Sequence, residues 1–441
     1  MLLFLIVLMA LLLVGAMVLS YLQSRDVFHP VMLLGPILLF IYVWMPLKLH
    51  DSGVLYRYFY PEQLLFVQSV NCLAVAALMA GALFNTQRRF EATTQLALAE
   101  NSERRLIIGS IVTGLIGFSA WLISIRNVGG VSEAFSHPYS GGWDDSGYIR
   151  DGSLVMFAAV AIAMPIFAFG RRKLSAFLVI AAFILPWMIQ ALFTSRRGPT
   201  FMIAAFLFIG YCICKQVRPP ILLVLIGAAA LGYGILFLVV NRSELYIGSH
   251  FNLKADVSSF WKQSDTGNEY LYGSGAMIGA HYTGNYFWGR RYIAQILIRP
   301  IPSSIWPTKY EDFGVAEVLQ NAGTGSTIRE ALGWDGAPGS APGVVADVWV
   351  EFSWLVIPVL WLIGRAYGLV WSCALQRNGM WASQYTVLCA LSLYLVMQTL
   401  EAVIFRFLLM SIPIWLTWYW ADRSNVAHLE QVTCLAVGET V

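Results

Sequence analysis

Charge is scarce in this chain of 441 residues, of which only 12% are charged and 58% are hydrophobic. An ordinary soluble domain carries about twice that share of charged residues and fewer apolar ones. The formal net charge of +3 is small, and no segment resembles a nucleic-acid-binding module. The composition therefore excludes an ordinary soluble protein and predicts no nucleic-acid partner.

Cysteine is also scarce, and its six positions show no pairing pattern. Five of them lie in or beside apolar runs, namely Cys72, Cys212, Cys214, Cys373 and Cys389, and Cys434 lies in the polar tail. This placement predicts neither a disulfide framework nor a metal site. The sequence also lacks a phosphate-binding loop of the ATPase type, an Asp-x-Asp pair in the long polar loop, and the nucleophile motif of hydrolases. A chemistry without metal or cofactor is the simpler prediction.

Long apolar runs are abundant instead. About 20 apolar residues are needed for a helix to cross the hydrocarbon core of a bilayer. Eleven such runs are predicted at 2–21, 30–47, 64–84, 105–124, 153–170, 174–194, 199–214, 220–240, 343–372, 382–400 and 404–421. None shows the alternation of a membrane-barrel strand. The chain is therefore predicted to be an all-α polytopic membrane protein with eleven spans, or twelve if one run is missed.

The spacing of the runs divides the chain into three parts. Residues 1–240 are predicted to form an N-terminal bundle of about eight spans, and residues 343–441 form the C-terminal spans and a cytoplasmic tail. Between them, residues 241–342 form a long loop that is dense in aromatic residues. Because such a loop can pack, we expect it to fold into short helices at the membrane surface.

The distribution of basic residues predicts the orientation of the spans. Arginine and lysine are enriched in cytoplasmic loops. Clusters such as Arg88-Arg89 and Arg171-Arg172-Lys173 lie inside if the N-terminus lies outside. In this arrangement the long loop is external.

Cations gather at the predicted external side of the membrane. They are Arg196 and Arg197 between two spans, Arg242 after the eighth span, and Arg290, Arg291, Arg299 and Lys309 in the long loop. Guanidinium groups bind phosphate in two-point fashion, and several of them could hold a diphosphate and stabilise its departure. The alternative for each is that it only anchors a helix end at the interface.

A general base for a transfer to a sugar hydroxyl is sought among nearby histidines and acids. His281, Glu269 and Asp347 are the candidates, because histidine titrates near neutrality and a partly buried carboxylate can also accept a proton. A lone loop histidine is more often structural. Glu351 and Glu401 lie at span ends, where an unpaired carboxylate is costly, so each is expected to pair with an arginine or to line a cavity.

Three motifs in order resemble a known family over about residues 190–370. They are Ser195-Arg196-Arg197-Gly198-Pro199, then Ile301-Pro302-Ser303-Ser304-Ile305-Trp306-Pro307-Thr308-Lys309, then Ala341-Pro342-Gly343 leading to Glu351-Phe352 and Gly364-Arg365. With the predicted spans, they resemble the bacterial O-antigen and exopolysaccharide repeat-unit polymerases of the Wzy type.

The resemblance implies a membrane glycosyltransferase with a GT-C-like architecture in the bacterial inner membrane. Such an enzyme polymerises oligosaccharide repeat units linked to undecaprenyl diphosphate on the periplasmic face, without metal or nucleotide sugar. It implies the lipid-linked oligosaccharide and the bilayer as partners, with a chain-length regulator as a further candidate. Arg196 and Arg197 would border the donor site, and Arg290, Arg291 and Lys309 would belong to the loop that closes over diphosphate and sugar.

Two alternatives remain open at this point. An O-antigen ligase has the same architecture but delivers the glycan to a lipid A core. A flippase or other transporter of lipid-linked glycan would place its basic residues along a path within the helices. Because most of the cations here gather at one predicted face, the sequence favours transfer over transport.

Overall fold

The computed structural model describes residues 1–84, 98–136, 147–194, 197–241, 243–250, 252–254, 256, 269–301, 305–313 and 341–438. Within these ranges, the side chains of residues 147–148, 194, 197 and 423–438 are not described. Every regular element in the described ranges is a helix. The prediction of an all-α protein is confirmed.

Eleven helices or helix pairs are long and apolar enough to cross a membrane, as predicted from the sequence. They are Leu2–Ser24, Pro30–Asp51, Pro61–Leu83, Glu100–Asn127, Ile149–Phe169, Lys173–Phe193, Gly198–Lys215, Ile221–Val240, Gly343–Arg377, Met380–Met397 and Leu400–Asp422. Each predicted apolar run falls on one of them. The chain is a multi-pass membrane protein.

The helices fall into two compact units, each built from separate stretches of the sequence. The first unit comprises Met1–Phe90, Lys262–Ser372 and Leu391–Phe405, and the second comprises Glu91–Trp261, Cys373–Ala390 and Arg406–Val441. Three helices, α21 (Val356–Arg377), α22 (Met380–Met397) and α23 (Leu400–Gly438), contribute residues to both units. The candidate site described below lies in the first unit.

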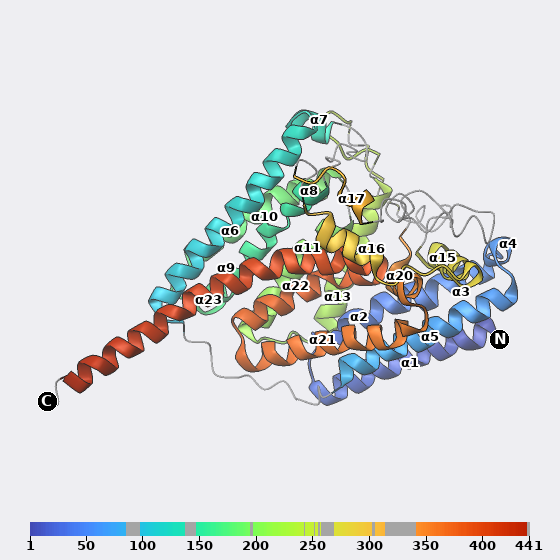
Figure 1. Ribbon diagram of the computed structural model, residues 1–441, viewed down its shortest axis with the longest axis horizontal. Coiled ribbons are helices and arrows are strands. Elements are labelled where there is room, and N and C mark those ends of the chain that lie inside the picture. Colours follow the sequence, from blue (N-terminus) through green and yellow to red (C-terminus); the bar gives the residue numbers. More distant parts are fainter. Residues whose placement is uncertain are drawn as a thin grey trace. The chain divides into compact units, whose positions relative to one another are not determined.

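The N-terminal part of the first unit is a group of neighbouring helices (Figure 1). Its elements are α1 (Leu2–Ser24), α2 (Pro30–Leu39), η1 (Phe40–Trp44), α3 (Met45–Asp51), α4 (Leu55–Tyr58) and α5 (Pro61–Leu83). Helices α2, η1 and α3 follow one another without a break and form the second span, in which η1 is a π-helical segment. Helix α1 packs against both α2 and α5.

Two glycines allow the backbones of α5 and α21 to come into direct contact. A Cβ atom added to Gly364 would lie 2.0 Å from the carbonyl oxygen of Leu78, and one added to Gly81 would lie 2.1 Å from that of Trp361. Small residues commonly permit such close crossings between membrane helices. The crossing therefore depends on the absence of a side chain at both positions.

A backbone break divides the ninth span into two helices. Helix α20 (Gly343–Phe352) is followed by a single 3-10 turn, η6 (Ser353–Leu355), and then by α21. Ser353 adopts a left-handed φ of 53°, which interrupts the helical path. Helix α21 has 22 residues and is about 33 Å long at the usual rise, so it is long enough to cross a bilayer without α20.

The long segment between the eighth and ninth spans contains the short helices that the sequence predicts. They are α15 (Glu269–Thr283), α16 (Arg290–Ile293), η5 (Ala294–Ile298) and α17 (Lys309–Asp312). Residues 270–280 of α15 are all buried, and this helix packs against α20 and α5. It is thus part of the core of the first unit.

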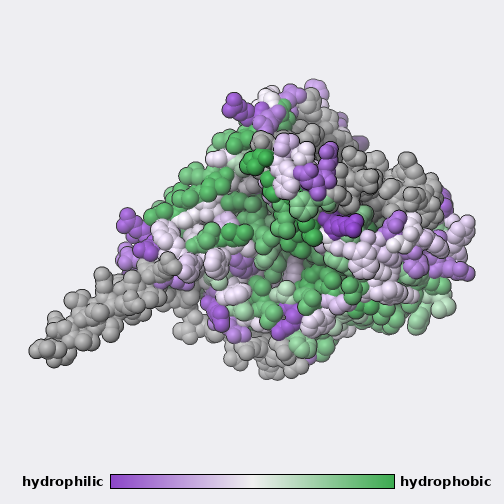
Figure 2. Space-filling view, in the orientation of Figure 1, coloured by the Kyte–Doolittle hydropathy of each residue, from purple (hydrophilic) through white to green (hydrophobic). Residues whose placement is uncertain are grey.

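The second unit is built around α9 (Val155–Phe169), which is buried along almost its whole length. Its other elements are α6 (Glu100–Asn127), α7 (Val131–Phe135), α8 (Gly147–Gly152), α10 (Lys173–Thr194), α11 (Arg197–Ala204), η3 (Ala205–Ile209), α12 (Gly210–Lys215) and α13 (Ile221–Val240). Helices α6 and α10 pack against α9. Apolar side chains cover the outer face of α6 (Figure 2), including the exposed Val112, Leu115 and Ile116.

A buried carboxylate joins α6 to the start of α10 in the second unit. Glu103 is buried, and its oxygens accept hydrogen bonds from the backbone N–H groups of Arg171 at 3.0 Å and Arg172 at 3.3 Å. These N–H groups precede the first turn of α10, where a negative charge is favourable.

Replacing Glu103 with alanine is expected to lower the free energy of unfolding by about 1–3 kcal/mol, because two backbone donors at the start of α10 lose their acceptor. The melting temperature of the purified protein in detergent measures this loss. Glu100 is the matched control, since it lies on the same helix but its ion pair with Arg172 is exposed. Its replacement by alanine should change stability by less than about 1 kcal/mol, and equal effects of the two variants would contradict the interpretation.

Candidate functional site

Two acids on α20 face the same side of the helix. Asp347 and Glu351 are four residues apart, so their side chains lie on the same face of the helix, one turn apart. Both are fully buried. Buried carboxylates need cationic or hydrogen-bonding partners, because burial removes their hydration.

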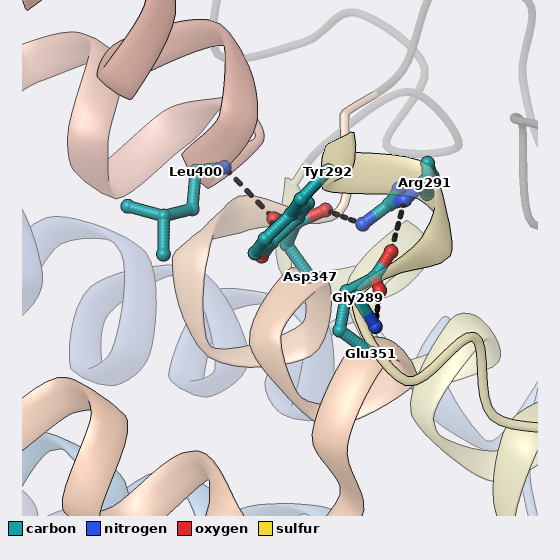
Figure 3. A network of polar contacts seen from close by, with 6 residues as sticks. All are labelled: Gly289, Arg291, Tyr292, Asp347, Glu351 and Leu400. Atoms are coloured by element: carbon teal, nitrogen blue, oxygen red, sulfur yellow. Dashed lines mark hydrogen bonds and ion pairs between the residues drawn. The ribbon is translucent and has the colours of Figure 1, made fainter. Parts of the chain in front are cut away.

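Arg291 is the cation that both acids share. Its Nε donates to Glu351 Oε1 at 2.7 Å, and an Nη group donates to Asp347 Oδ1. The arginine is only 1% exposed. Figure 3 shows its guanidinium group between the two carboxylates, so one arginine of α16 bridges two turns of α20.

Asp347 connects three helices at one carboxylate. Besides the contact with Arg291, its Oδ2 accepts from the hydroxyl of Tyr292 at 2.6 Å and from the backbone N–H of Leu400 at 2.8 Å. Leu400 is the first residue of α23, and the N–H groups of a helix's first turn have no acceptor within the helix. Asp347 therefore ties α16 and α23 to α20 (Figure 3).

Glu351 holds the loop that precedes α16. Its Oε2 accepts from the N–H of Gly289 at 2.8 Å, and its backbone carbonyl accepts from the N–H of Trp288 at 2.8 Å. Trp288 and Gly289 both have left-handed φ values, 52° and 82°. For tryptophan this conformation is unfavourable, so the loop depends on these contacts to keep its shape.

The charge state of the site follows from its composition. Burial would lower the pKa of Arg291, but the carboxylates of Asp347, Glu401 and Glu351 raise it well above its ordinary value. Burial and the charge of Asp347 raise the pKa of Tyr292, so its hydroxyl stays protonated and donates. The site thus holds a permanent cation beside a hydroxyl that keeps its proton.

Asp347 and Arg291 occupy positions that differ from the roles predicted for them. Both oxygens of Asp347 already accept hydrogen bonds in a buried network, which does not suit a general base for a substrate hydroxyl. The guanidinium of Arg291 is buried against protein carboxylates, which does not suit contact with a diphosphate. Together with Glu351 they form a buried ion-pair network that connects α16 to α20, which we call the brace.

Arg290 lies next to this brace with its side chain exposed. Successive residues of a helix point about 100° apart, so an inward Arg291 directs Arg290 outward. The predicted role of Arg290 in anion binding is compatible with this position.

Arg299 and Lys309 lie together at the end of η5. The Lys309 amine donates to the carbonyl oxygens of Arg299, at 3.2 Å, and Ile301, and it lies 4.8 Å from the centre of the Tyr310 ring. Lys309 is 1% exposed, and the described residues provide it with no carboxylate in an ion pair. Arg299 is half-buried and donates to Gln295 at 2.9 Å. Lys309 therefore anchors the start of α17 to the backbone of residues 299–301, which follow η5.

The two other candidate bases are far apart. Glu269 begins α15 and is half-buried, whereas His281 lies near the end of that helix and is exposed. Twelve helical steps separate them by about 18 Å. The ring of His281 stacks on Phe66 with centroids 4.3 Å apart. The structure therefore does not bring these two residues together.

The remaining predicted cations fall outside the described parts of the chain. Arg196 and Arg242 lie outside the described residues, and Arg197 begins α11 with a side chain that is not described. Their predicted contact with a diphosphate stays a prediction. Within the described ranges, no three His, Cys, Asp or Glu side chains come close enough to hold a metal ion.

Aromatic side chains surround the loop that Glu351 holds. The buried Trp349 lies between α5 and the loop, with ring centroids 5.5 Å from Phe66, 6.3 Å from Tyr286 and 5.1 Å from Trp354. Trp288, in contact with Tyr286, is 59% exposed, and Trp354 is 53% exposed. An exposed guanidinium and exposed aromatic rings thus lie around one fixed loop.

Glu351 was expected to pair with an arginine or to line a cavity, and it pairs with Arg291, but neither it nor Tyr292 was predicted as a binding or catalytic residue. The signal for Glu351 was the i, i+4 pair of acids within an apolar run, which indicates one shared cation on the same helix face. Tyr292 gave no signal in the sequence, because its role depends on the packing of α16 against α20.

The fold and the site define an all-helical multi-pass membrane protein with a buried ionic brace in one of its two units. Comparisons with protein-family profiles, curated proteins and solved structures find no significant match.

Proposed function

We propose that this protein is a membrane glycosyltransferase that polymerises undecaprenyl-diphosphate-linked oligosaccharide repeat units into O-antigen or exopolysaccharide. The bacterial inner membrane is the proposed location, with the site at the periplasmic face. The observation that carries the proposal is the exposed Arg290, which lies between the exposed Trp288 and the buried ionic brace in the sequence. The motifs that resemble the Wzy-type polymerases support it.

The chemistry of the site suits a lipid-linked donor. A guanidinium can bind the diphosphate and stabilise the charge that develops as the bond from the anomeric carbon to the diphosphate oxygen breaks. Exposed tryptophan rings offer apolar faces to a sugar ring or to the membrane interface. The binding surface would thus lie where a lipid-anchored substrate can reach it.

The transfer requires a hydroxyl of the acceptor sugar to attack the anomeric carbon. The bond to the diphosphate breaks with its electron pair on the lipid diphosphate, and a base takes the hydroxyl proton. Among the three bases predicted from the sequence, His281 is exposed, whereas Glu269 is half-buried at the start of α15 and Asp347 is engaged in the brace. His281 is therefore the proposed base.

An elongation assay tests the proposal. Purified protein in liposomes, given only a synthetic undecaprenyl-diphosphate repeat unit, should produce a ladder of longer products. Arg290→Ala should abolish the ladder and Arg290→Lys should restore little of it, because an ammonium lacks the two-point geometry. Arg57→Ala is the control, since Arg57 is an exposed arginine of α4 in the same unit.

The competing functions give different results. Movement of the substrate between leaflets without elongation would contradict the polymerase and support a flippase. The surface polysaccharide of a deletion strain separates the two enzymes, because loss of a polymerase leaves single repeat units attached whereas loss of a ligase leaves none.

A further inference from the structure

The adjacent arginines of α16 have different environments, although the sequence gives them the same chemistry. Arg291 is buried and paired with Asp347 and Glu351, whereas Arg290 is exposed. A guanidinium with two buried carboxylate partners is fixed in place, because separating the charges in a low-dielectric interior is costly. Arg291 therefore holds the first turn of α16 against α20.

The carboxylate of Glu351 holds both the backbone and a side chain at the start of α16. One of its carboxylate oxygens accepts from Gly289 N and the other from Arg291 Nε, so the acid spans the residues on both sides of Arg290. The carbonyl oxygens of Val350 and Glu351 accept from the N–H groups of Phe287, at 3.2 Å, and Trp288. These contacts join residues 287–291, at the end of the loop and the start of α16, to the last turn of α20.

The position of Arg290 follows from these contacts. Its neighbours in the sequence, Gly289 and Arg291, are both bonded to the carboxylate of Glu351. Without that carboxylate, Gly289 N–H and Arg291 Nε lose their acceptor, and the left-handed Trp288 and Gly289 keep only backbone hydrogen bonds, such as that from Trp288 N–H to the Glu351 carbonyl oxygen. Arg290 would then leave its place at the surface.

We infer that Glu351 is a positioning residue for an anion-binding Arg290: it sets the direction of that guanidinium through Gly289 and Arg291 without touching the anion. The inference rests on the proposed function, since it assumes that the anion is the diphosphate of a lipid-linked glycan. It adds a residue that acts through the loop and assigns different tasks to the two arginines.

A double-mutant cycle tests whether Glu351 acts through Arg290. The measured quantity is the Kd for undecaprenyl diphosphate, titrated into phosphatidylethanolamine nanodiscs that contain the wild-type protein, Glu351→Gln, Arg290→Ala or the double variant. Glu351→Gln keeps the shape of the side chain and removes its charge. We expect it to weaken binding about tenfold in the wild-type background and to have no further effect once Arg290 is alanine.

Two more variants separate positioning from folding. Glu351→Asp retains the carboxylate and should recover part of the affinity, and Glu311→Gln should leave the Kd unchanged because Glu311 is an exposed acid of the same segment. The melting temperature should fall equally when Glu351→Gln is introduced with or without Arg290. An equal loss of affinity in both backgrounds would overturn the inference, as would tighter binding by Glu351→Gln.

Failure of the proposed function has a different signature. If the wild-type protein binds undecaprenyl diphosphate no better than undecaprenol and elongates nothing, the polymerase proposal fails. If the wild-type protein binds and elongates but the cycle is additive, only the role of Glu351 is wrong.

Discussion

Replacing Asp347 with alanine is expected to lower the free energy of unfolding by about 3–5 kcal/mol, the loss typical of a buried ion pair that has one partner removed. The substitution leaves the guanidinium of Arg291 with one carboxylate contact fewer in a buried site. It also removes the acceptor of the Tyr292 hydroxyl and of the Leu400 N–H group. Thermal unfolding in detergent and the yield of membrane-inserted protein measure the effect.

Related variants identify the cause of that loss. Asp347→Asn should be less damaging than Asp347→Ala, because an amide oxygen can still accept from one donor. Asp51→Ala is the control for removal of an acid in the same unit, since the Asp51 side chain is 69% exposed. Replacing Arg291, Asp347 and Glu351 together with Met, Leu and Met should restore part of the stability, because the three interacting charges are removed together and replaced by apolar packing. A stability of Asp347→Ala equal to that of the wild type would contradict the role of Asp347 as a junction.

Replacing Gly364 with alanine is expected to separate α5 from α21 and to lower the free energy of unfolding by about 1–3 kcal/mol, as overpacking does. The new Cβ would lie 2.0 Å from the Leu78 carbonyl oxygen and 2.9 Å from the Ala82 nitrogen. Both are backbone atoms, so no side-chain rotation can relieve the clash. A leucine at this position should cost more than alanine, and the melting temperature measures both.

The same crossing supplies two internal checks. Gly81→Ala meets the Trp361 carbonyl oxygen at 2.1 Å, and its effect should not add fully to that of Gly364→Ala, because both substitutions widen one contact. Gly227→Ala on α13 has no atom within 4 Å of the new Cβ. That control should be neutral or stabilising by about 0.5–1 kcal/mol, since alanine is the better helix former. If Gly227→Ala and Gly364→Ala lowered the melting temperature equally, close packing would not be the cause.

The spans could be predicted from the sequence because each depends on one local property, the length of an apolar run. The break at Ser353 could not, because a left-handed serine inside an apolar run leaves no compositional signal. The sequence therefore predicts one helix at 343–372, where the structure has α20, a turn and α21.

The site was predicted in part. Residue type and predicted location identified Arg290 and Arg291 as candidate diphosphate-binding residues and Asp347 as a candidate base. Their separate roles depend on burial and on which side chains meet across more than 50 positions of sequence, as Arg291 meets Asp347 and Glu351. No local pattern distinguishes Arg290 from Arg291, because only the packing of α16 against α20 decides which of the two faces inward.

The lysine that fastens the end of η5 has a consequence for how this segment can change in evolution. Lys309 binds the main-chain oxygens of residues 299 and 301, which every amino acid provides. Side chains at those two positions can therefore be exchanged without loss of the anchor, whereas position 309 requires a long cationic side chain. A segment fastened in this way can acquire new surface chemistry while its backbone keeps the same course.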